Sequence, residues 1–182
     1  MSSRRELTAD SAVEVVAALV SETLQAHGIV AVLSGGAVVS IYTENEFQSH
    51  DLDYISSETV GRISAAMQSI GFVRERGRHF HHPATAFVVE FPAGPLMVGD
   101  QMVHRHAELE TSYGVIRLLT PTDAVKDRLS AFFHWQDRQA LEQALAICRR
   151  QPVDEADLAR WAKAERQPGR FGIFLERLRL QS

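Results

Sequence analysis

The pattern of apolar residues in this chain changes character at about residue 119. Before that point, short apolar runs typical of strands alternate with segments of helical periodicity, and glycine or proline separates them. After it, only helical patterns follow. The segment Thr120-Pro121-Thr122-Asp123 begins them with a cap residue, a proline at the first helical position and an early carboxylate. The sequence therefore predicts an α+β fold in which a mixed α/β core is followed by a helical C-terminal region.

Length and composition agree with this division. A chain of 182 residues, 45% of them hydrophobic, has enough apolar material for one core without disulfides. We place the core at residues 1–119 and the helical region at 120–182, and the sequence leaves open whether the two pack as one domain. The net charge of -4 gives no overall basic surface of the kind that coats nucleic acid, although a local basic patch is compatible with it.

The expected elements follow from periodicity and caps. A capping box of Ser11 and Glu14 predicts the start of the first helix, and Gly28 predicts its end. Residues 77–82 are expected to form a turn and residues 92–99 a loop. The other expected strands are 29–33, 50–55, 72–76, 85–91 and 115–119, and the other expected helices are 37–42, 59–70, 122–134, 138–149, 154–165 and a short segment at 171–180.

The cellular setting is predicted from three features. The single cysteine, Cys148, lies in an apolar helical context, which favours a buried thiol over a nucleophile and suits a reducing compartment. Arg4 and Arg5 are followed by Glu6 and Asp10, which a secretory signal would not contain. No run approaches the roughly 20 apolar residues of a membrane span. We therefore expect a cytoplasmic protein without a membrane partner.

Two aspartates carry the first sign of chemistry. Asp51 and Asp53 are two residues apart on a predicted strand, so their side chains share one face. Neighbouring carboxylates repel unless a cation joins them, and Mg²⁺ or Mn²⁺ prefers such oxygen ligands together with substrate phosphates. Glu90 lies in an otherwise apolar strand and would be the third metal ligand, with Asp100 held in reserve. Taken singly, an Asp-x-Asp on a strand is more often solvated surface.

A glycine turn supplies the second sign. Ser34-Gly35-Gly36 separates a predicted strand from a predicted helix, and its glycines allow backbone amides to approach a triphosphate at a helix N-terminus. The pair of glycines is weak alone. The order of strand, glycine turn, helix, Asp-x-Asp strand and carboxylate strand favours a site for a Mg²⁺-nucleotide.

These residues resemble a known signature. Leu33-Ser34-Gly35-Gly36 followed by Asp51-Leu52-Asp53 resembles the nucleotidyltransferase (polymerase-β-like) superfamily, which pairs a glycine turn with an Asp-x-Asp strand and a later strand carboxylate. Residues 119–129 and 134–138 resemble the downstream part of its AbiEii/MenT-like branch. The resemblance implies a nucleotidyltransferase-like core with a mixed sheet flanked by helices. It also implies that Lys126 contacts the nucleotide phosphates and that Asp137 is the later acidic residue of the nucleotide site. Gly36 departs from it, because the branch usually has serine there.

The function expected from residues and resemblance together is transfer of a nucleoside monophosphate from an NTP, such as ATP, to an acceptor hydroxyl. The amides of Ser34, Gly35 and Gly36, with Lys126, would hold the triphosphate. The resemblance implies a tRNA end or a protein side chain as the acceptor, and a toxin held by an antitoxin. Two alternatives stay open: a catalytically inactive nucleotide- or partner-binding module on the same fold, and a phosphohydrolase that uses histidines.

Histidines and tryptophans leave further alternatives. Arg78 and His79 begin a basic segment that also contains His81 and His82. Without a cysteine this segment is a poor zinc site, so it is either a phosphate or acceptor contact or a solvated turn. Trp135 could stack a base, but its helical spacing with neighbouring phenylalanines favours core packing.

Overall fold

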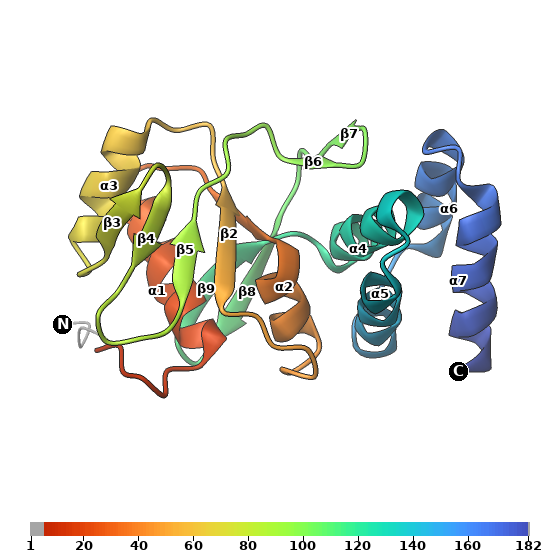
Figure 1. The fold of residues 1–182 in the computed structure, drawn as a ribbon, viewed down its shortest axis with the longest axis horizontal. Coiled ribbons are helices and arrows are strands. Elements are labelled where there is room, and N and C mark those ends of the chain that lie inside the picture. The colour runs from red at the N-terminus through yellow and green to blue at the C-terminus, as the bar shows by residue number, and fades with distance from the viewer. Residues whose placement is uncertain (1–5, 182) are drawn as a thin grey trace.

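Seven strands form one mixed sheet in the computed structural model of the protein, which describes residues 6–181. They are β1 (Val32–Ser34), β2 (Asp51–Ile55), β3 (Val73–Arg76), β4 (His79–His81), β5 (Val88–Glu90), β8 (Ala107–Thr111) and β9 (Gly114–Leu118). Their order in the sheet is β3-β4-β5-β2-β1-β9-β8, and β6 (Met97–Val98) and β7 (Gln101–Met102) form a separate hairpin. Figure 1 shows this hairpin between the sheet and the C-terminal helices.

Helices flank the sheet and then form the rest of the chain. The core contains α1 (Val13–Ala26), α2 (Gly35–Tyr42) and α3 (Val60–Gln68), and the C-terminal region contains α4 (Pro121–Trp135), α5 (Arg138–Arg150), α6 (Glu155–Ala164) and α7 (Pro168–Leu180). The latter four lie together on one side of the sheet (Figure 1). The predicted change from a mixed α/β core to a helical region is confirmed. No helix within residues 6–181 is both long and apolar enough to cross a membrane.

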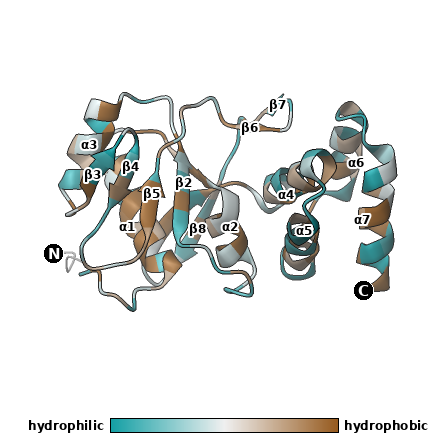
Figure 2. Cartoon of the chain, in the orientation of Figure 1, coloured by the Kyte–Doolittle hydropathy of each residue, from teal (hydrophilic) through white to brown (hydrophobic). Residues whose placement is uncertain are grey.

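The two faces of β2 differ in chemistry. Leu52 and Tyr54 are fully buried, and the Tyr54 hydroxyl donates to the Ala17 carbonyl of α1 at 2.8 Å. Asp51 and Asp53 alternate with them and therefore lie on the opposite face. Figure 2 shows the hydrophilic stretches of β2 beside the mostly hydrophobic β5. One face of the central sheet is thus core, and the other presents carboxylates.

The start of the chain differs from the expectation. The N-cap of α1 is Ala12, which makes no side-chain cap bond, and Ser11 Oγ accepts from the Thr8 N–H at 2.9 Å, so the predicted capping box is wrong. The strand expected at 29–33 is displaced to β1. The reason is that the Ile29 N–H still donates to the Leu24 carbonyl of α1 at 2.9 Å.

The start of the helical region is as expected. Thr120 Oγ1 accepts from the Asp123 N–H at 3.1 Å, and Pro121 occupies the first turn of α4. Trp161 is buried and stacks on Phe133 with ring centroids 5.4 Å apart. Trp135 is 82% exposed, so its predicted core packing is wrong.

Short strands account for most remaining differences. The segment expected as a turn at 77–82 contains β4, and the strand expected at 85–91 is reduced to β5. The hairpin of β6 and β7 and the strand β8 were not expected. In β8, at the edge of the sheet next to β9, the exposed Glu108 and Glu110 alternate with half-buried residues. Cys148 is half-buried rather than fully buried, and burial raises the pKa of its thiol to about 12, which disfavours nucleophilic chemistry.

Candidate active site

Three carboxylates share the polar face of the central strands. Asp53 on β2 is the register partner of Glu90 on β5 and, on its other side, of Ser34 on β1. Register partners on adjacent strands point to the same face, and Asp51 joins them from two residues before Asp53. The structure therefore brings the three predicted metal ligands onto one face of the sheet, on the neighbouring strands β2 and β5.

The electrostatics of this set centre on Asp53. Burial raises the pKa of Asp53 first, and the charges of Glu90 and Asp51 raise it further. No three His, Cys, Asp or Glu side chains within residues 6–181 converge closely enough to form a ready ligand set. Hard carboxylate oxygens that destabilise each other's charge nevertheless have the donor chemistry of a site for a divalent cation.

The glycine turn lies directly against Asp53. Gly35 has φ +69°, and a Cβ added to it would lie 2.8 Å from Asp53 Oδ2. Ser34 caps α2 without a side-chain cap bond, and its hydroxyl donates instead to the Asp53 carbonyl at 3.2 Å. The first backbone amides of α2 are thus held beside the carboxylate, where the helix dipole favours anions.

A serine hydroxyl lies beside Gly36 although the chain has no serine at that position. A Cβ added to Gly36 would lie 3.0 Å from Ser49 Oγ. The Ser49 N–H donates to Ser40 Oγ at 3.0 Å, and Ser49 Oγ donates to the Asp51 carbonyl at 3.1 Å. Ser49 comes from the loop before β2, so only the folded chain reveals this hydroxyl at the turn.

The basic segment before β5 divides between two roles. His79 Nδ1 lies 3.0 Å from Glu90 Oε1, which places this imidazole at the edge of the carboxylate set. Arg78 is committed to backbone carbonyls, donating to Glu58 at 2.9 Å and to Phe91 at 3.2 Å. His82 packs against Phe72 with ring centroids 5.1 Å apart, so the histidines are not gathered in one place.

Lys126 and Asp137 have partners of their own. Lys126 is 6% exposed, and its Nζ lies 2.6 Å from Asp157 Oδ2 and 3.2 Å from Asp123 Oδ1. Asp137 caps α5, where its Oδ1 accepts from the Ala140 N–H at 3.0 Å. The phosphate contact of Lys126 and the nucleotide role of Asp137 stay predictions.

Three further charged residues, Asp100, Asp127 and Arg128, differ in whether they lie near Asp53. Asp100 lies in the turn between β6 and β7, where its N–H donates to Glu165 Oε1 at 2.9 Å, so it is not part of the sheet that holds Asp53. Asp127 and Arg128, which the sequence did not single out, lie close enough to act on Asp53: Asp127 raises its pKa and Arg128 lowers it. The Arg128 Nη2 lies 2.5 Å from Asp127 Oδ2. Their adjacency to Lys126 on α4 is the only signal in the sequence.

Comparison with known proteins bears on the fold. No protein-family model and no curated protein matches the chain. The crystal structure of an antigenic nucleotidyltransferase-like protein from Paracoccidioides brasiliensis matches with a TM-score of 0.58 at 12% identity, over 78% of each chain. Two structures of ANT(2'')-Ia also match at 12% identity. The crystal structure of its complex with adenylyl-2''-tobramycin has a TM-score of 0.49 and covers 91% of this chain and 97% of that one. The solution structure has a TM-score of 0.45 and covers 85% and 95%. The match to the Paracoccidioides brasiliensis protein shows that this chain has the mixed α/β fold of a nucleotidyltransferase-like protein.

Proposed function

We propose that this protein transfers a nucleoside monophosphate from an NTP to an acceptor hydroxyl and releases pyrophosphate. One observation carries the proposal: Asp53 lies in register between Ser34 and Glu90, with Asp51 on the same face and the Gly35 backbone against its carboxylate. Backbone amides that favour an anion and carboxylates that favour a cation meet at one place. An NTP with its divalent cation supplies both, the triphosphate as the anion and the metal ion as the cation.

The carboxylates supply a fitting donor set for a divalent cation. Asp51, Asp53 and Glu90 would hold Mg²⁺ or Mn²⁺, since oxygen donors in a negatively charged group suit a hard cation. The bound cation would neutralise charge on the triphosphate. The charges that raise the pKa of Asp53 support this fit, because a cation would relieve the repulsion that they cause.

The remaining groups position the nucleotide and the acceptor. The amides of Ser34, Gly35 and Gly36 would contact phosphate oxygens, and the Ser49 hydroxyl would do so by exchanging its bond to the Asp51 carbonyl. Glu90 would take the proton of the acceptor hydroxyl, with His79 at 3.0 Å orienting its carboxylate. The acceptor oxygen then forms a bond to the α-phosphorus while the bond to pyrophosphate breaks.

The resemblance to the AbiEii/MenT-like branch supports further proposals of lower specificity. A tRNA end or a protein side chain would be the macromolecular acceptor, an antitoxin would be a partner, and the protein would act in the cytoplasm. Phosphate contact by Lys126 would require its ammonium to exchange Asp157 for the phosphate, since the two now lie 2.6 Å apart.

Transfer is tested with NTPs labelled at the α-phosphate. The protein is incubated with Mg²⁺ and the RNA, protein and small-molecule fractions of a cell extract, and the label in each fraction is measured. Asp53→Asn and Glu90→Gln should lower incorporation at least about 100-fold, because each would remove charge that is needed at the reacting phosphate. Glu110→Gln, on the exposed edge strand β8, is the matched control and should leave incorporation unchanged.

The same experiment separates the proposal from its alternative. Incorporation that Asp53→Asn leaves intact would contradict the assignment of the site. Mg²⁺-dependent NTP binding without any transfer would support the catalytically inactive binding module instead.

A further inference from the structure

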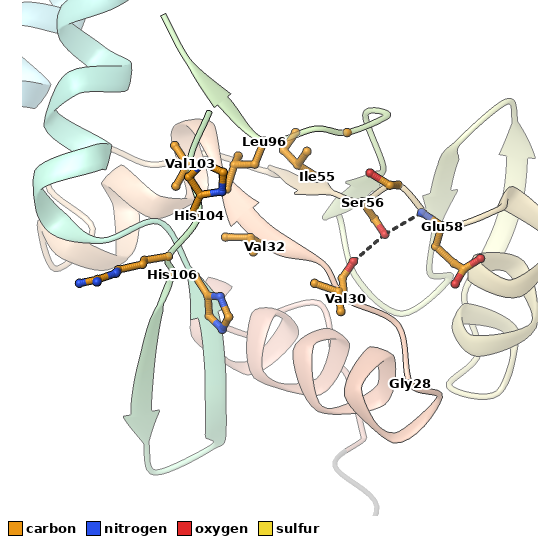
Figure 3. A pocket seen from close by; sticks show the side chains of 13 residues that line it. Gly28, Val30, Val32, Ile55, Ser56, Glu58, Leu96, Val103, His104 and His106 are labelled. Atoms are coloured by element: carbon orange, nitrogen blue, oxygen red, sulfur yellow. Dashed lines mark hydrogen bonds between the residues drawn. The ribbon is translucent and has the colours of Figure 1, made fainter. Parts of the chain in front are cut away.

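A hollow of about 400 Å³ lies next to the carboxylates on the same face of the sheet. Val32 on β1 and Ile55 on β2 line it, and they are register partners. Ile55 is two residues beyond Asp53 on β2, so the two side chains share a face and lie about 7 Å apart along the strand. Figure 3 shows Val32 and Ile55 together with Leu96 and Val103, which also line the hollow.

The body of the hollow is apolar. Leu96 and Val103, which flank the β6–β7 hairpin, line it, and the Val103 N–H donates to the Leu96 carbonyl at 2.9 Å. Val30, on the rim, is 79% exposed. A ligand with an aliphatic or aromatic body would remove this surface from water, and the volume is of the size that small-molecule sites have.

The polar group on one wall is already satisfied. The buried Ser56 hydroxyl donates to the Val30 carbonyl at 2.7 Å and accepts from the Glu58 N–H at 3.2 Å. The Glu58 carboxylate forms an ion pair with Arg62. This wall therefore offers a ligand little uncompensated negative charge.

The opposite wall contains an arginine that forms no ion pair with the described residues. His104, Arg105 and His106 connect β7 to β8 and line the hollow. None of the three has a hydrogen bond or an ion pair with the rest of residues 6–181. Arg105 is permanently charged and offers a planar array of donors that matches carboxylate and phosphate oxygens.

We propose that this hollow is the acceptor site and that it selects a small organic anion, a hydroxyl compound that carries a phosphate or carboxylate on an apolar body. The inference rests on the proposed function. The anionic group pairs with Arg105, the body packs on Val32, Ile55 and Leu96, and the hydroxyl extends along β2 toward Asp53. A cationic acceptor is disfavoured because Arg105 repels it and Arg62 already neutralises Glu58.

Selectivity is tested with three probes that share a phenyl ring and differ in charge: phenyl phosphate, benzyl alcohol and benzylamine. They are titrated into methyl-labelled protein, and the NMR shifts of the Val32, Ile55 and Val103 methyl groups are followed, with Leu175 on α7 as the distant reference. Phenyl phosphate should bind at least about tenfold more tightly than the other two and should shift only the methyl groups of the hollow. Equal binding of the three probes, or shifts elsewhere only, would overturn the proposal.

Two variants test whether Arg105 supplies the positive charge that selects an anion. Arg105→Gln should abolish the advantage of phenyl phosphate, because it removes the cation without removing the apolar floor. Arg179→Gln, an exposed arginine at the end of α7, is the matched control and should keep that advantage. An advantage that survives Arg105→Gln would contradict the role of this wall.

The acceptor assignment is tested by repeating the titration with saturating NTP and Mg²⁺. Phenyl phosphate should still bind, since the nucleotide occupies the glycine turn and not the hollow. Displacement of the probe by NTP would overturn the assignment, because the hollow would then hold the nucleotide. If no NTP binds while phenyl phosphate still depends on Arg105, the proposed function fails but the anion selectivity of the hollow stands.

Discussion

Asp53 is half-buried beside two other carboxylates, and burial, followed by the charges of Glu90 and Asp51, raises its pKa. The folded chain therefore binds a proton at Asp53 more tightly than the unfolded chain does. Above the raised pKa the carboxylate is ionised in the folded chain, and the cost of burying this charge beside two others lowers the free energy of unfolding in full. This reduction shrinks as the pH falls through the raised pKa and is absent below the ordinary value of 3.8.

Asp53→Asn is accordingly expected to stabilise the metal-free protein near neutral pH while it abolishes NTP binding. The gain in the free energy of unfolding should shrink as the pH is lowered from neutral toward the ordinary pKa of 3.8. Urea unfolding of both proteins in the presence of a chelator measures it. An Asp53→Asn protein that is less stable than wild type near neutral pH would show that no such charge repulsion exists.

Gly35 is restricted by both its backbone and its neighbour. Alanine at this position adopts φ +69° with strain and places a Cβ 2.8 Å from Asp53 Oδ2. We expect Gly35→Ala to lower the free energy of unfolding by about 1–2 kcal/mol and to weaken NTP binding, because Asp53 must move. Gly172→Ala is the control: Gly172 lies in α7 with no atom near an added Cβ, and its substitution should raise stability by up to about 1 kcal/mol. Equal responses of the two variants would contradict the close approach at Gly35.

At the scale of elements, Lys126 connects α4 to α6 through an ion pair with Asp157. Its buried ammonium lies between Asp123 and Asp157, and Lys126→Met would leave two carboxylates facing each other. We expect a loss of about 2 kcal/mol in the free energy of unfolding, whereas Lys163→Met on the exposed side of α6 should change it by less than about 0.5 kcal/mol. Calorimetry on the same variants adds a second readout. If NTP affinity falls in Lys126→Met but not in Lys163→Met, the ammonium also reaches the phosphates. An unchanged free energy of unfolding in Lys126→Met would show that the ion pair does not stabilise the contact between α4 and α6.

The β6–β7 hairpin, whose flanking residues Leu96 and Val103 line the hollow, is bonded to one carboxylate of the C-terminal helical region. Glu165 is 3% exposed at its side chain, and it accepts from the Asp100 N–H at 2.9 Å and contacts His134 at 3.2 Å. Glu165→Ala should speed amide hydrogen exchange in residues 96–103 by at least about tenfold and leave β1 and β2 unchanged. Glu176→Ala, on α7, serves as the control. Unchanged exchange in the hairpin would mean that other contacts hold it.

The sequence predicts those elements that depend on local chemistry. The glycine turn, the Asp-x-Asp strand and the Thr120 cap each combine residue types that favour one conformation, and the structure has β1, α2, β2 and α4 there. The strands β4, β6 and β7 are only two or three residues long, and β8 alternates half-buried with exposed residues. The hydrogen bonds of all four go to partners that only the fold provides. The Ser49 hydroxyl beside Gly36, and Arg105 beside the apolar hollow, are likewise products of the tertiary structure.

At the scale of the whole molecule, side chains connect the core to the helical region. Gln151 Nε2 at the end of α5 donates to the Tyr42 carbonyl at the end of α2 at 3.3 Å, and Arg150 of α5 lies 2.7 Å from Glu46 of the core. We therefore expect residues 1–119 and 120–182 to unfold together. In a Trp135→Phe protein, Trp161 fluorescence should report the same urea midpoint as the methyl NMR signals of the sheet. Two separate midpoints would show that the regions are independent domains.

The central claim is that the carboxylate face of β2 and β5 binds an NTP together with a divalent cation. Calorimetric titration of each NTP, with and without Mg²⁺, into wild type and into the double variant Asp51→Ala/Asp53→Ala tests it most directly. We expect wild type to bind an NTP only when Mg²⁺ is present and the double variant to bind none. If wild type binds no NTP, or if both proteins bind equally, the carboxylates are not a site for a metal-bound nucleotide.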